Sequence, residues 1–353
     1  MNVVFRVDSS SQIGSGHLMR CLTLAEKLRK EKDARIYFVM RNLEGNLIDI
    51  VQEKGFEVFI LNRVELDDSL EGYARWLTVS QERDAYEVAN IFKEIENIDL
   101  LVVDSYAIDI IWESIIRPYV KRIIVIDDLA NRKHDCDMLL DQNYYKNKDY
   151  RYEGLVPKAC KLFLGPQYAI LREEFYKARK HLKSRDGNIK NILVFFGGVD
   201  LTNETRKTLE AIIKFDKKDI TVNVIVGQSN PHKEDIKKIC DKYPYMNYYC
   251  QVNNIADFMN QADLAIGAGG TTTWERCFLG LPSIVIAVAE NQVEIAEDCN
   301  EVGYIKYLGF CKDVTTDDIS SIIQIMYGIE IVNMNNKILG DFCGTQNNIF
   351  ERS

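Results

Sequence analysis

Segments with the character of buried strands alternate with segments of helical periodicity along this chain, and the alternation occurs twice. The first run covers residues 2–141 and opens on an apolar strand at 2–7, followed by a helix at 17–29 whose apolar side chains share one face. The second run begins at residue 191, after turn-forming residues at 184–188. Strands separated by helices need crossover connections, which predict parallel sheets. The pattern therefore predicts an α/β chain with two Rossmann-like, doubly wound domains facing each other across a cleft.

The length of 353 residues also favours two domains, because a single core rarely grows beyond about 250–300 residues. We expect an N-terminal domain at 1–165, a linker at 166–188 and a C-terminal domain at 189–330. Residues 331–353 are expected to form a terminal helix that packs on the first domain, or a tail. Residues 62–80 are polar and irregular, which is typical of a flap over a site.

Further strands are predicted in two parts of the chain. Residues 128–161 are expected to be loops around a single strand at 138–141. In the second run, strands are expected at 191–196, 221–226, 246–250, 264–267 and 283–287, with the last helices near 315–327.

Charge and cysteine content exclude several classes of protein. The formal net charge of -9 argues against a general nucleic-acid binder, although backbone N–H groups can bind a phosphate without excess Lys or Arg. The chain enters a strand at once, without the basic segment and cleavage site of a signal peptide, and has no membrane-spanning apolar stretch. Nine cysteines without a C-x-x-C pair favour neither a disulfide framework nor a zinc site. We expect a cytoplasmic monomer or weak oligomer with no nucleic-acid or membrane partner.

A glycine-containing loop joins the first predicted strand to the first helix. Gly14 and Gly16 allow the backbone to approach a ligand. The nicotinamide-dinucleotide fingerprint does not fit, because Met19 stands where a third glycine belongs and the second strand ends at Arg41 rather than at an acid. His17 starts the helix at the ligand-binding edge of the sheet, where the helix dipole disfavours the protonated ring. His17 is therefore a candidate base, and a helix-entry histidine without a role is an equally good interpretation from these residues alone.

The remaining histidines and the acidic loop give no metal signature. His181 lies in a charged helix and His232 in a polar turn, so both are expected at the surface. His134 lies in an Asp-rich loop behind the acidic pair Asp127 and Asp128. We interpret this loop as ordered by hydrogen bonds, with a magnesium site as the less favoured alternative. We expect no metal and no cofactor, so activity should survive a chelator.

A second glycine loop, in the C-terminal run, is the sharper signal. An apolar strand ends in glycines and a helix begins among threonines, which leaves free N–H groups and hydroxyls suited to a diphosphate. Glu275 lies about one turn into that helix, where its carboxylate could accept hydrogen bonds from a ribose diol. A capping box, in which Glu275 returns to the cap backbone, fits equally well. The candidate diphosphate-binding residues are Gly269, Gly270, Thr271 and Thr272.

Two further polar segments are expected at the same edge of that sheet. Asn291 lies in the segment 290–292, just after the strand at 283–287, and a plain polar helix cap is its alternative interpretation. Gly197 and Gly198 follow the first strand of the second run, where they would face the cleft.

The motifs occur in an order that resembles a known family. The chain is similar over residues 3–307 to the UDP-2,4-diacetamido-2,4,6-trideoxy-β-L-altropyranose hydrolases of pseudaminic acid biosynthesis, and to related spore-coat polysaccharide proteins. That family in turn resembles the peptidoglycan glycosyltransferases of the GT-B fold. Each motif alone is weak, whereas the ordered set is specific. The motifs are residues 6–17 with Arg20 and Cys21, 103–106 with 112–113, 126–130 with 134–137, 141–143, 164–169 and 267–275.

The resemblance implies a substrate and a place for each part of it. The substrate is a UDP-linked deoxyamino sugar. UDP would lie on the C-terminal domain, with its diphosphate near residues 269–272, its ribose at Glu275, and Asn291 near the diphosphate or the sugar. The sugar would point at the N-terminal domain, where we expect Gly14, Gly16 and Arg20 to bind the substrate.

The resemblance also implies a reaction and its alternatives. His17 would be the general base that activates water, and Tyr106 would position that water or the sugar. Attack at the anomeric carbon would expel UDP without a metal. Nothing in the nucleotide site distinguishes this hydrolase from a glycosyltransferase of the same architecture, a UDP-sugar 2-epimerase or a non-catalytic UDP-sugar sensor.

Overall fold

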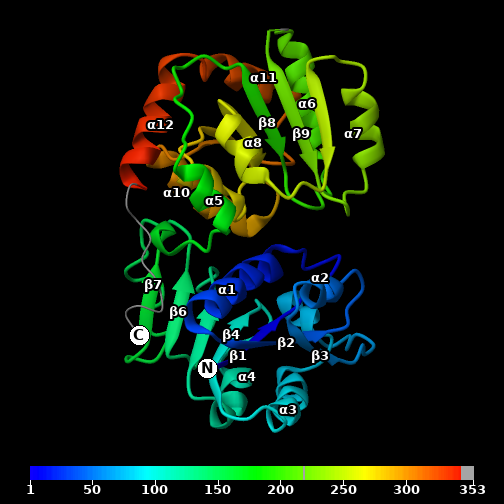
Figure 1. Cartoon of the computed structure of the whole chain (residues 1–353), viewed down its shortest axis with the longest axis vertical. Helices are drawn as coiled ribbons and strands as arrows, with labels where there is room; N and C mark the ends of the chain where they lie inside the picture. The colour runs from blue at the N-terminus through cyan, green and yellow to red at the C-terminus, as the bar shows by residue number, and fades with distance from the viewer. Residues whose placement is uncertain (218, 343–353) are drawn as a thin grey trace. The chain divides into compact units, whose positions relative to one another are not determined.

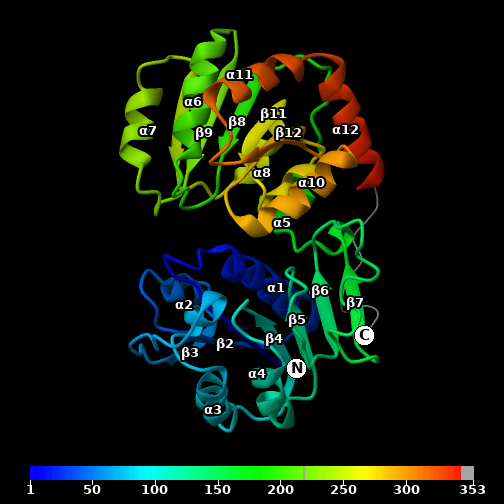
Figure 2. The same cartoon turned by 180° about the vertical axis from the view of Figure 1, so that it is seen from behind.

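The structure is a computed structural model that describes residues 1–217 and 219–342 as two domains, each with its own sheet (Figures 1 and 2). The first domain comprises residues 1–143 and 147–170, and the second comprises 144–146 and 171–342. Each cysteine in this described part is a free thiol. None of the helices described is long and apolar enough to cross a membrane.

The first domain is built on a seven-stranded parallel sheet in the order β3-β2-β1-β4-β5-β6-β7. On one face Phe5 shares a buried cluster with Leu18 of α1, and on the other Val4 shares one with Trp112 of α4, because successive side chains of a strand point to opposite faces. The strands are β1 (Asn2–Val7), β2 (Arg35–Arg41), β3 (Glu57–Leu61), β4 (Ile98–Asp104), β5 (Ile123–Ile126), β6 (Met138–Asp141) and β7 (Lys161–Leu164). The helices are α1 (Gly16–Lys32), α2 (Ile48–Glu53), α3 (Gln81–Phe92) and α4 (Ile110–Ile116), with short 3₁₀ helices η1 (Gly72–Leu77) and η2 (Arg117–Tyr119).

The second domain is built on a six-stranded parallel sheet in the order β10-β9-β8-β11-β12-β13. Ile192 and Val194 of β8 pack in one core with Leu209 of α6 and Ile319 of α11. The strands are β8 (Asn191–Phe195), β9 (Thr221–Val226), β10 (Met246–Cys250), β11 (Leu264–Ala268), β12 (Ser283–Ala287) and β13 (Lys306–Phe310). The helices are α5 (Glu173–Arg179), α6 (Glu204–Phe215), α7 (Lys233–Cys240), α8 (Ile255–Gln261), α9 (Thr272–Phe278), α10 (Val293–Glu301), α11 (Thr316–Ile325) and α12 (Ile329–Asp341), with the 3₁₀ helix η4 (Glu290–Gln292). The 3₁₀ helix η3 (Pro166–Tyr168) belongs to the first domain.

Two features of the chain differ from the sequence-based expectations. The strand expected at 138–141 is confirmed as β6, but the edge strand β7, which begins at Lys161 and pairs with β6, was not predicted. Helix α12 packs on α9 of the second domain rather than on the first, and Asn335 Nδ2 donates a hydrogen bond of 2.6 Å to the Gly280 carbonyl. The part of the predicted terminal segment at 343–353 lies outside the described residues.

The order of the strands defines one ligand-binding edge in each sheet. In the first sheet the chain winds outward in one direction from β1 and in the other from β4, so the loops after these neighbouring strands diverge. In the second sheet β8 and β11 have the same relation. Open α/β sheets bind ligands outside the carboxyl ends of the strands at such a switch point. Both candidate glycine loops and the residue pair Asp104 and Tyr106 occupy these positions.

Candidate active site

The switch point of the first domain brings a histidine, an aspartate and an arginine into direct contact. His17 Nδ1 lies 2.6 Å from Asp104 Oδ1, and 87 residues separate the two in the sequence. Arg20, one turn further along α1, donates from Nε to Asp104 Oδ2 and from a terminal nitrogen to Oδ1, both at 2.6 Å. Asp104 is 1% exposed and His17 is 9% exposed. Arg20 thus holds the carboxylate that holds the histidine.

The electrostatics of this triad favour one tautomer of the histidine. Burial alone would raise the pKa of the Asp104 carboxyl, but the charge of Arg20, the nearby His17 and the hydrogen bonds from both hold that pKa well below its ordinary value. An ionised carboxylate only accepts, so Nδ1 of His17 carries the proton. Within residues 1–217 and 219–342 nothing hydrogen-bonds to Nε2. Nε2 is therefore available as an acceptor for an incoming proton.

Aromatic rings from the predicted flap and from the end of β4 surround His17. The ring of Tyr106 meets the imidazole edge-on at 4.7 Å between centroids, and Trp76 meets it at 5.8 Å. Trp76 also stacks on Tyr106 at 5.4 Å, and Tyr73 contacts both. Sequence reasoning missed Tyr73 and Trp76, although both lie on η1, inside the segment 62–80. An aromatic cluster in a polar loop was the signal that could have found them.

The hydroxyl of Tyr106 is engaged with an acid and keeps its proton. Its Oη donates to Asp128 Oδ1 at 2.5 Å, and Asp128 Oδ2 accepts from Asn143 Nδ2 at 3.1 Å. Burial, and then the charge of Asp128, raise the pKa of Tyr106 well above its ordinary value. Tyr106 is thus unsuited to act as the base, and its ring and hydroxyl are suited to position a neighbour.

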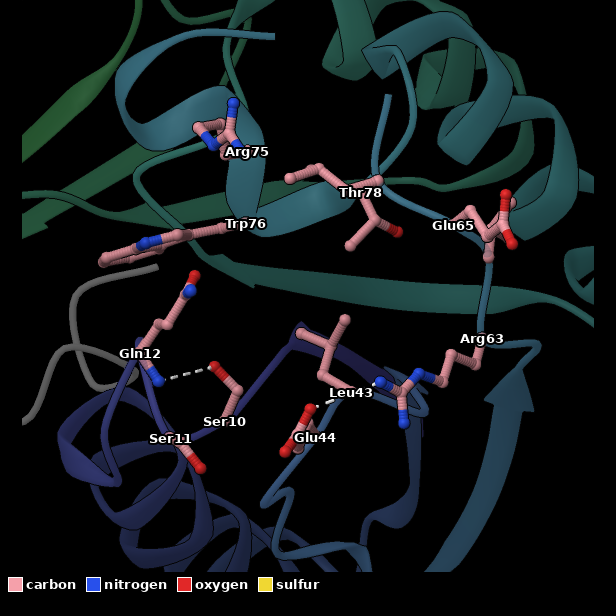
Figure 3. Close-up of a pocket in the computed structure, with 12 residues that line it drawn as sticks. Ser10, Ser11, Gln12, Leu43, Glu44, Arg63, Glu65, Arg75, Trp76 and Thr78 are labelled. Carbon is pink, nitrogen blue, oxygen red and sulfur yellow. Dashed lines mark hydrogen bonds and ion pairs between the residues drawn. The ribbon is translucent and has the colours of Figure 1, made fainter. Parts of the chain in front are cut away.

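A cavity of about 730 Å³ lies in the first domain between the glycine loop after β1 and the flap (Figure 3). Trp76 belongs both to this cavity and to the aromatic wall of His17. A side chain at Gly14 or Gly16 would meet nothing within 4 Å, so the loop backbone is open to a ligand. The lining mixes charged, amide, hydroxyl and apolar groups: Ser10, Ser11, Gln12, Leu43, Glu44, Arg63, Val64, Glu65, Leu66, Arg75, Trp76 and Thr78.

The acidic loop and His134 are parts of internal hydrogen-bond networks. Asp127 pairs with Arg132 at 2.7 Å, while Asp128 is bound as described above. His134 is 1% exposed, and its Nδ1 lies 2.7 Å from Glu113 Oε1. No group of three or more His, Cys, Asp or Glu side chains in the described part of the chain could hold a metal ion.

The glycine loop of the second domain follows β11, as expected, and is backed by polar side chains. A side chain at Gly269 would meet Gln292 at 3.4 Å, and one at Gly270 would approach the same residue at 3.9 Å. Thr271 is exposed, and Thr272 Oγ1 accepts a hydrogen bond of 3.3 Å from Arg276. The glycines of the loop therefore lie close to Gln292 on one side, while Thr271 is exposed to solvent.

Glu275 is held by an arginine that the sequence did not single out. Its Oε1 accepts from Arg172 at 3.0 Å, while its Oε2 is buried without a hydrogen-bond partner. Burial raises the pKa of Glu275, and Arg172 opposes that shift. The capping box is not formed, since the side chain of Thr271 makes no cap hydrogen bond. An unpaired buried carboxylate oxygen is costly and is a feature that a hydroxyl-bearing ligand would relieve.

Asn291 lies in η4, in the turn after β12, next to the residue that backs the glycine loop. Gln292 Oε1 accepts from the Val288 N–H at 3.0 Å, which orders this turn. The second domain thus brings Asn291, Glu275 and the loop at 269–272 to the carboxyl edge of its sheet.

Comparison with known sequences finds relatives that span most of the chain. Residues 192–308 match the glycosyltransferase family 28 C-terminal domain. The UDP-2,4-diacetamido-2,4,6-trideoxy-β-L-altropyranose hydrolase of Campylobacter jejuni is 29% identical over 86% of this chain and 98% of its own length. The spore coat polysaccharide biosynthesis protein SpsG of Bacillus subtilis is 27% identical over 88% of this chain and 84% of its length. Protein MJ1062 of Methanocaldococcus jannaschii is 31% identical over 84% of this chain, which spans only 58% of that relative.

Solved structures of glycosyltransferases share the fold. MurG of Acinetobacter baumannii superimposes with a TM-score of 0.65 and 11% identity, covering 99% of this chain and 97% of its own. UGT2 of Phytolacca americana, in a complex with UDP-2-fluoro-glucose and pterostilbene, gives 0.68 and 11%, covering 98% and 94%. At such identities the likeness concerns the fold alone. The chain therefore has two Rossmann-like domains of the GT-B fold, its residues 192–308 match the family 28 C-terminal domain, and it is similar to the UDP-diacetamido-trideoxy-altropyranose hydrolases, as its ordered motifs predict.

Proposed function

We infer that this protein hydrolyses a UDP-linked 2,4-diacetamido-2,4,6-trideoxyhexose of the altropyranose type, releasing UDP and the free sugar for pseudaminic acid biosynthesis. The observation that carries the proposal is the pair His17–Asp104, with Nδ1 engaged at 2.6 Å and Nε2 free of partners in the described chain. The name of the Campylobacter relative supports the same substrate and reaction.

The chemistry assigned to His17 is general-base catalysis. Nε2 takes a proton from water while the water oxygen forms a bond to the anomeric carbon. The bond between that carbon and the glycosidic oxygen breaks, and its electron pair stays on the β-phosphate of the departing UDP. The resulting imidazolium is stabilised by Asp104, whose lowered pKa keeps it ionised. Tyr106 and Trp76 restrict where the water and the sugar ring can lie.

The binding roles follow from the arrangement within each domain. The cavity beside Trp76 offers amide, hydroxyl and apolar groups, which suit the acetamido and methyl substituents of the sugar. On the second domain we assign the diphosphate to the loop 269–272, the ribose diol to the unpaired oxygen of Glu275, and Asn291 to the diphosphate or sugar.

A glycosyltransferase is the second candidate, because the family 28 domain and the solved structures above belong to sugar-transferring enzymes. It would pass the sugar to an acceptor in place of water. A non-catalytic UDP-sugar sensor would bind the same nucleotide without releasing UDP, and a 2-epimerase would yield a 2-epimeric sugar. These functions differ in products measured without an acceptor.

The proposal is tested by incubating the purified protein with the UDP-diacetamido-trideoxyhexose in ¹⁸O-water, without acceptor and with EDTA. We expect UDP release, with the label on C1 of the sugar, and no loss of rate with the chelator. Label on the β-phosphate would mean attack at phosphorus and would contradict the mechanism. No UDP release, or release only after an acceptor is added, would favour the sensor or the transferase. Loss of activity in EDTA that Mg²⁺ restores would overturn metal independence.

Replacing Glu275 by alanine is expected to weaken UDP binding about tenfold or more, because a charge-assisted hydrogen bond contributes about 1.5–3 kcal/mol. Isothermal titration calorimetry measures the change. Glu174→Ala is the matched control, since Glu174 also pairs with Arg172, at 2.6 Å. Equal losses in both variants, or unchanged affinity in Glu275→Ala, would remove the ribose role of Glu275.

A further inference from the structure

A buried arginine without an acidic partner lies behind the second glycine loop. Arg276 is 2% exposed. It donates to the Ala268 carbonyl at 2.9 Å and to the hydroxyls of Thr273 and Thr272 at 3.0 and 3.3 Å. Its Nε is buried and has no hydrogen-bond partner, and no ion pair in the described chain includes it. Burying a cation without an ion pair costs folding free energy, so a functional explanation for the charge of Arg276 is expected.

A second buried arginine in the same domain shows what a purely structural explanation looks like. Arg185 is 6% exposed, and it donates to the carbonyls of Met259, Asn260 and Ala262, at the C-terminal end of α8, as well as to that of Leu279. The C-terminal end of a helix carries partial negative charge, which compensates a buried guanidinium. Arg276 has no helix end to compensate it: its hydrogen-bond partners among the described residues are one carbonyl and two hydroxyls, and the charge of Glu275 acts on it without a direct ion pair.

The contacts of Arg276 lie on both sides of the loop 269–271. Ala268 ends β11, and Thr272 and Thr273 begin α9, so the guanidinium connects the two ends of the loop. A side chain at Gly267 would come within 3.2 Å of its terminal nitrogen, which shows how closely the backbone covers it. Burial lowers the pKa of Arg276 to about 10, so the guanidinium stays charged at neutral pH. A fixed positive charge thus lies directly behind the open loop.

We propose that Arg276 is a positioning residue whose buried charge makes this loop selective for the diphosphate of the nucleotide, acting from behind the loop rather than by direct contact. The inference rests on the proposed function, in which the loop holds the diphosphate of UDP. The diphosphate would add negative charge close to Arg276, which forms no direct ion pair within the described chain. The same charge favours the departing UDP, because negative charge grows on the β-phosphate as the anomeric bond breaks.

The test compares the affinities of UDP and uridine for each variant by calorimetry, because uridine lacks the diphosphate. In Arg276→Gln, which keeps hydrogen-bond donors without the charge, we expect the ratio of UDP to uridine affinity to fall about tenfold or more. In Arg276→Lys, which keeps the charge, the ratio should stay within about threefold of the wild type. Arg185→Gln is the matched control: its thermal stability should fall, and its ratio should not change.

Each outcome bears on one hypothesis. If the affinities for UDP and uridine fall together in Arg276→Gln and their ratio is unchanged, Arg276 only holds the two ends of the loop together. That result would overturn the inference. If Arg276→Gln does not fold, a folded Arg276→Lys with a tenfold lower ratio would overturn it equally. A wild-type protein that does not bind UDP would instead remove the proposed function, and that result is read before any variant is compared.

Discussion

Replacing His17 by asparagine is expected to lower turnover of the UDP-sugar about 10²–10⁴-fold, the usual contribution of a positioned general base. UDP affinity should stay unchanged, because the residues assigned to UDP belong to the second domain. The measurements are steady-state UDP release and calorimetric UDP binding. His17 Nε2 is the acceptor that the reaction needs, and asparagine cannot take up a proton at neutral pH.

His134→Asn provides a matched control for this loss. Both histidines place Nδ1 on a carboxylate, at 2.6 Å for His17 and 2.7 Å for His134. His134 is 1% exposed, so its ring is closed off from any substrate. The control should lose stability and keep its turnover per folded molecule. Full activity in His17→Asn, with label still on C1, would place the base elsewhere and leave the reaction class intact.

Replacing Asp104 by asparagine is expected to cost a similar factor, about 10²–10⁴-fold in kcat, with little change in UDP affinity. The amide N–H of asparagine would donate to Nδ1 of His17 and shift the ring proton to Nε2, which removes the acceptor. Glu113→Gln makes the same change beside His134 and should leave kcat per folded molecule unaltered. A fully active, folded Asp104→Asn enzyme would contradict the role given to the pair.

The same substitution has an expected signature in acid. The pKa of Asp104 is lowered in the folded chain, so its ionised form stabilises the fold at pH values above its unfolded pKa of about 3.9. That stabilisation is lost as pH falls below 3.9 towards the folded pKa, at about 1.4 kcal/mol per pH unit. Denaturant unfolding should show the wild type more stable than Asp104→Asn at pH 5, by a margin that shrinks at pH 3. A constant margin would mean that Arg20 and His17 do not lower the pKa of Asp104 in the folded chain.

The two strands that the sequence analysis did not predict, β7 and β13, both lie at sheet edges, although the edge strand β10 was predicted. Strand β1 has four apolar residues out of six and is buried from Val3 to Val7, because both of its faces are covered by helices. The edge strand β7 has four residues, two of them exposed, and β13 is partly exposed throughout. Neither gives a run of apolar residues or a clean alternation. Edge strands are therefore harder to recognise from composition than the strands of a buried parallel sheet.

The glycine loops show what local pattern determines by itself. A strand that ends in glycines before a helix must place backbone N–H groups at the carboxyl edge of a parallel sheet, wherever the rest of the chain lies. The candidates His17, Gly269 and Glu275 follow from that rule and from the ordered motifs. Their chemical surroundings do not.

Only the tertiary structure decided the partners of these residues. Asp104 reaches His17 across 87 residues because β4 pairs with β1, and Arg172 reaches Glu275 across 103 residues. The flap rings Tyr73 and Trp76 become the wall of the site by packing on Tyr106. Sequence spacing carries no information about such contacts, because sheet order and loop packing set them, and the free energy of an ion pair or a ring contact depends on distance and burial rather than on position in the chain. The sequence by itself therefore determined the sheet edges and the candidate residues. The tertiary structure determined which side chains orient each candidate, which charges lie beside it, and which of its polar atoms have no partner.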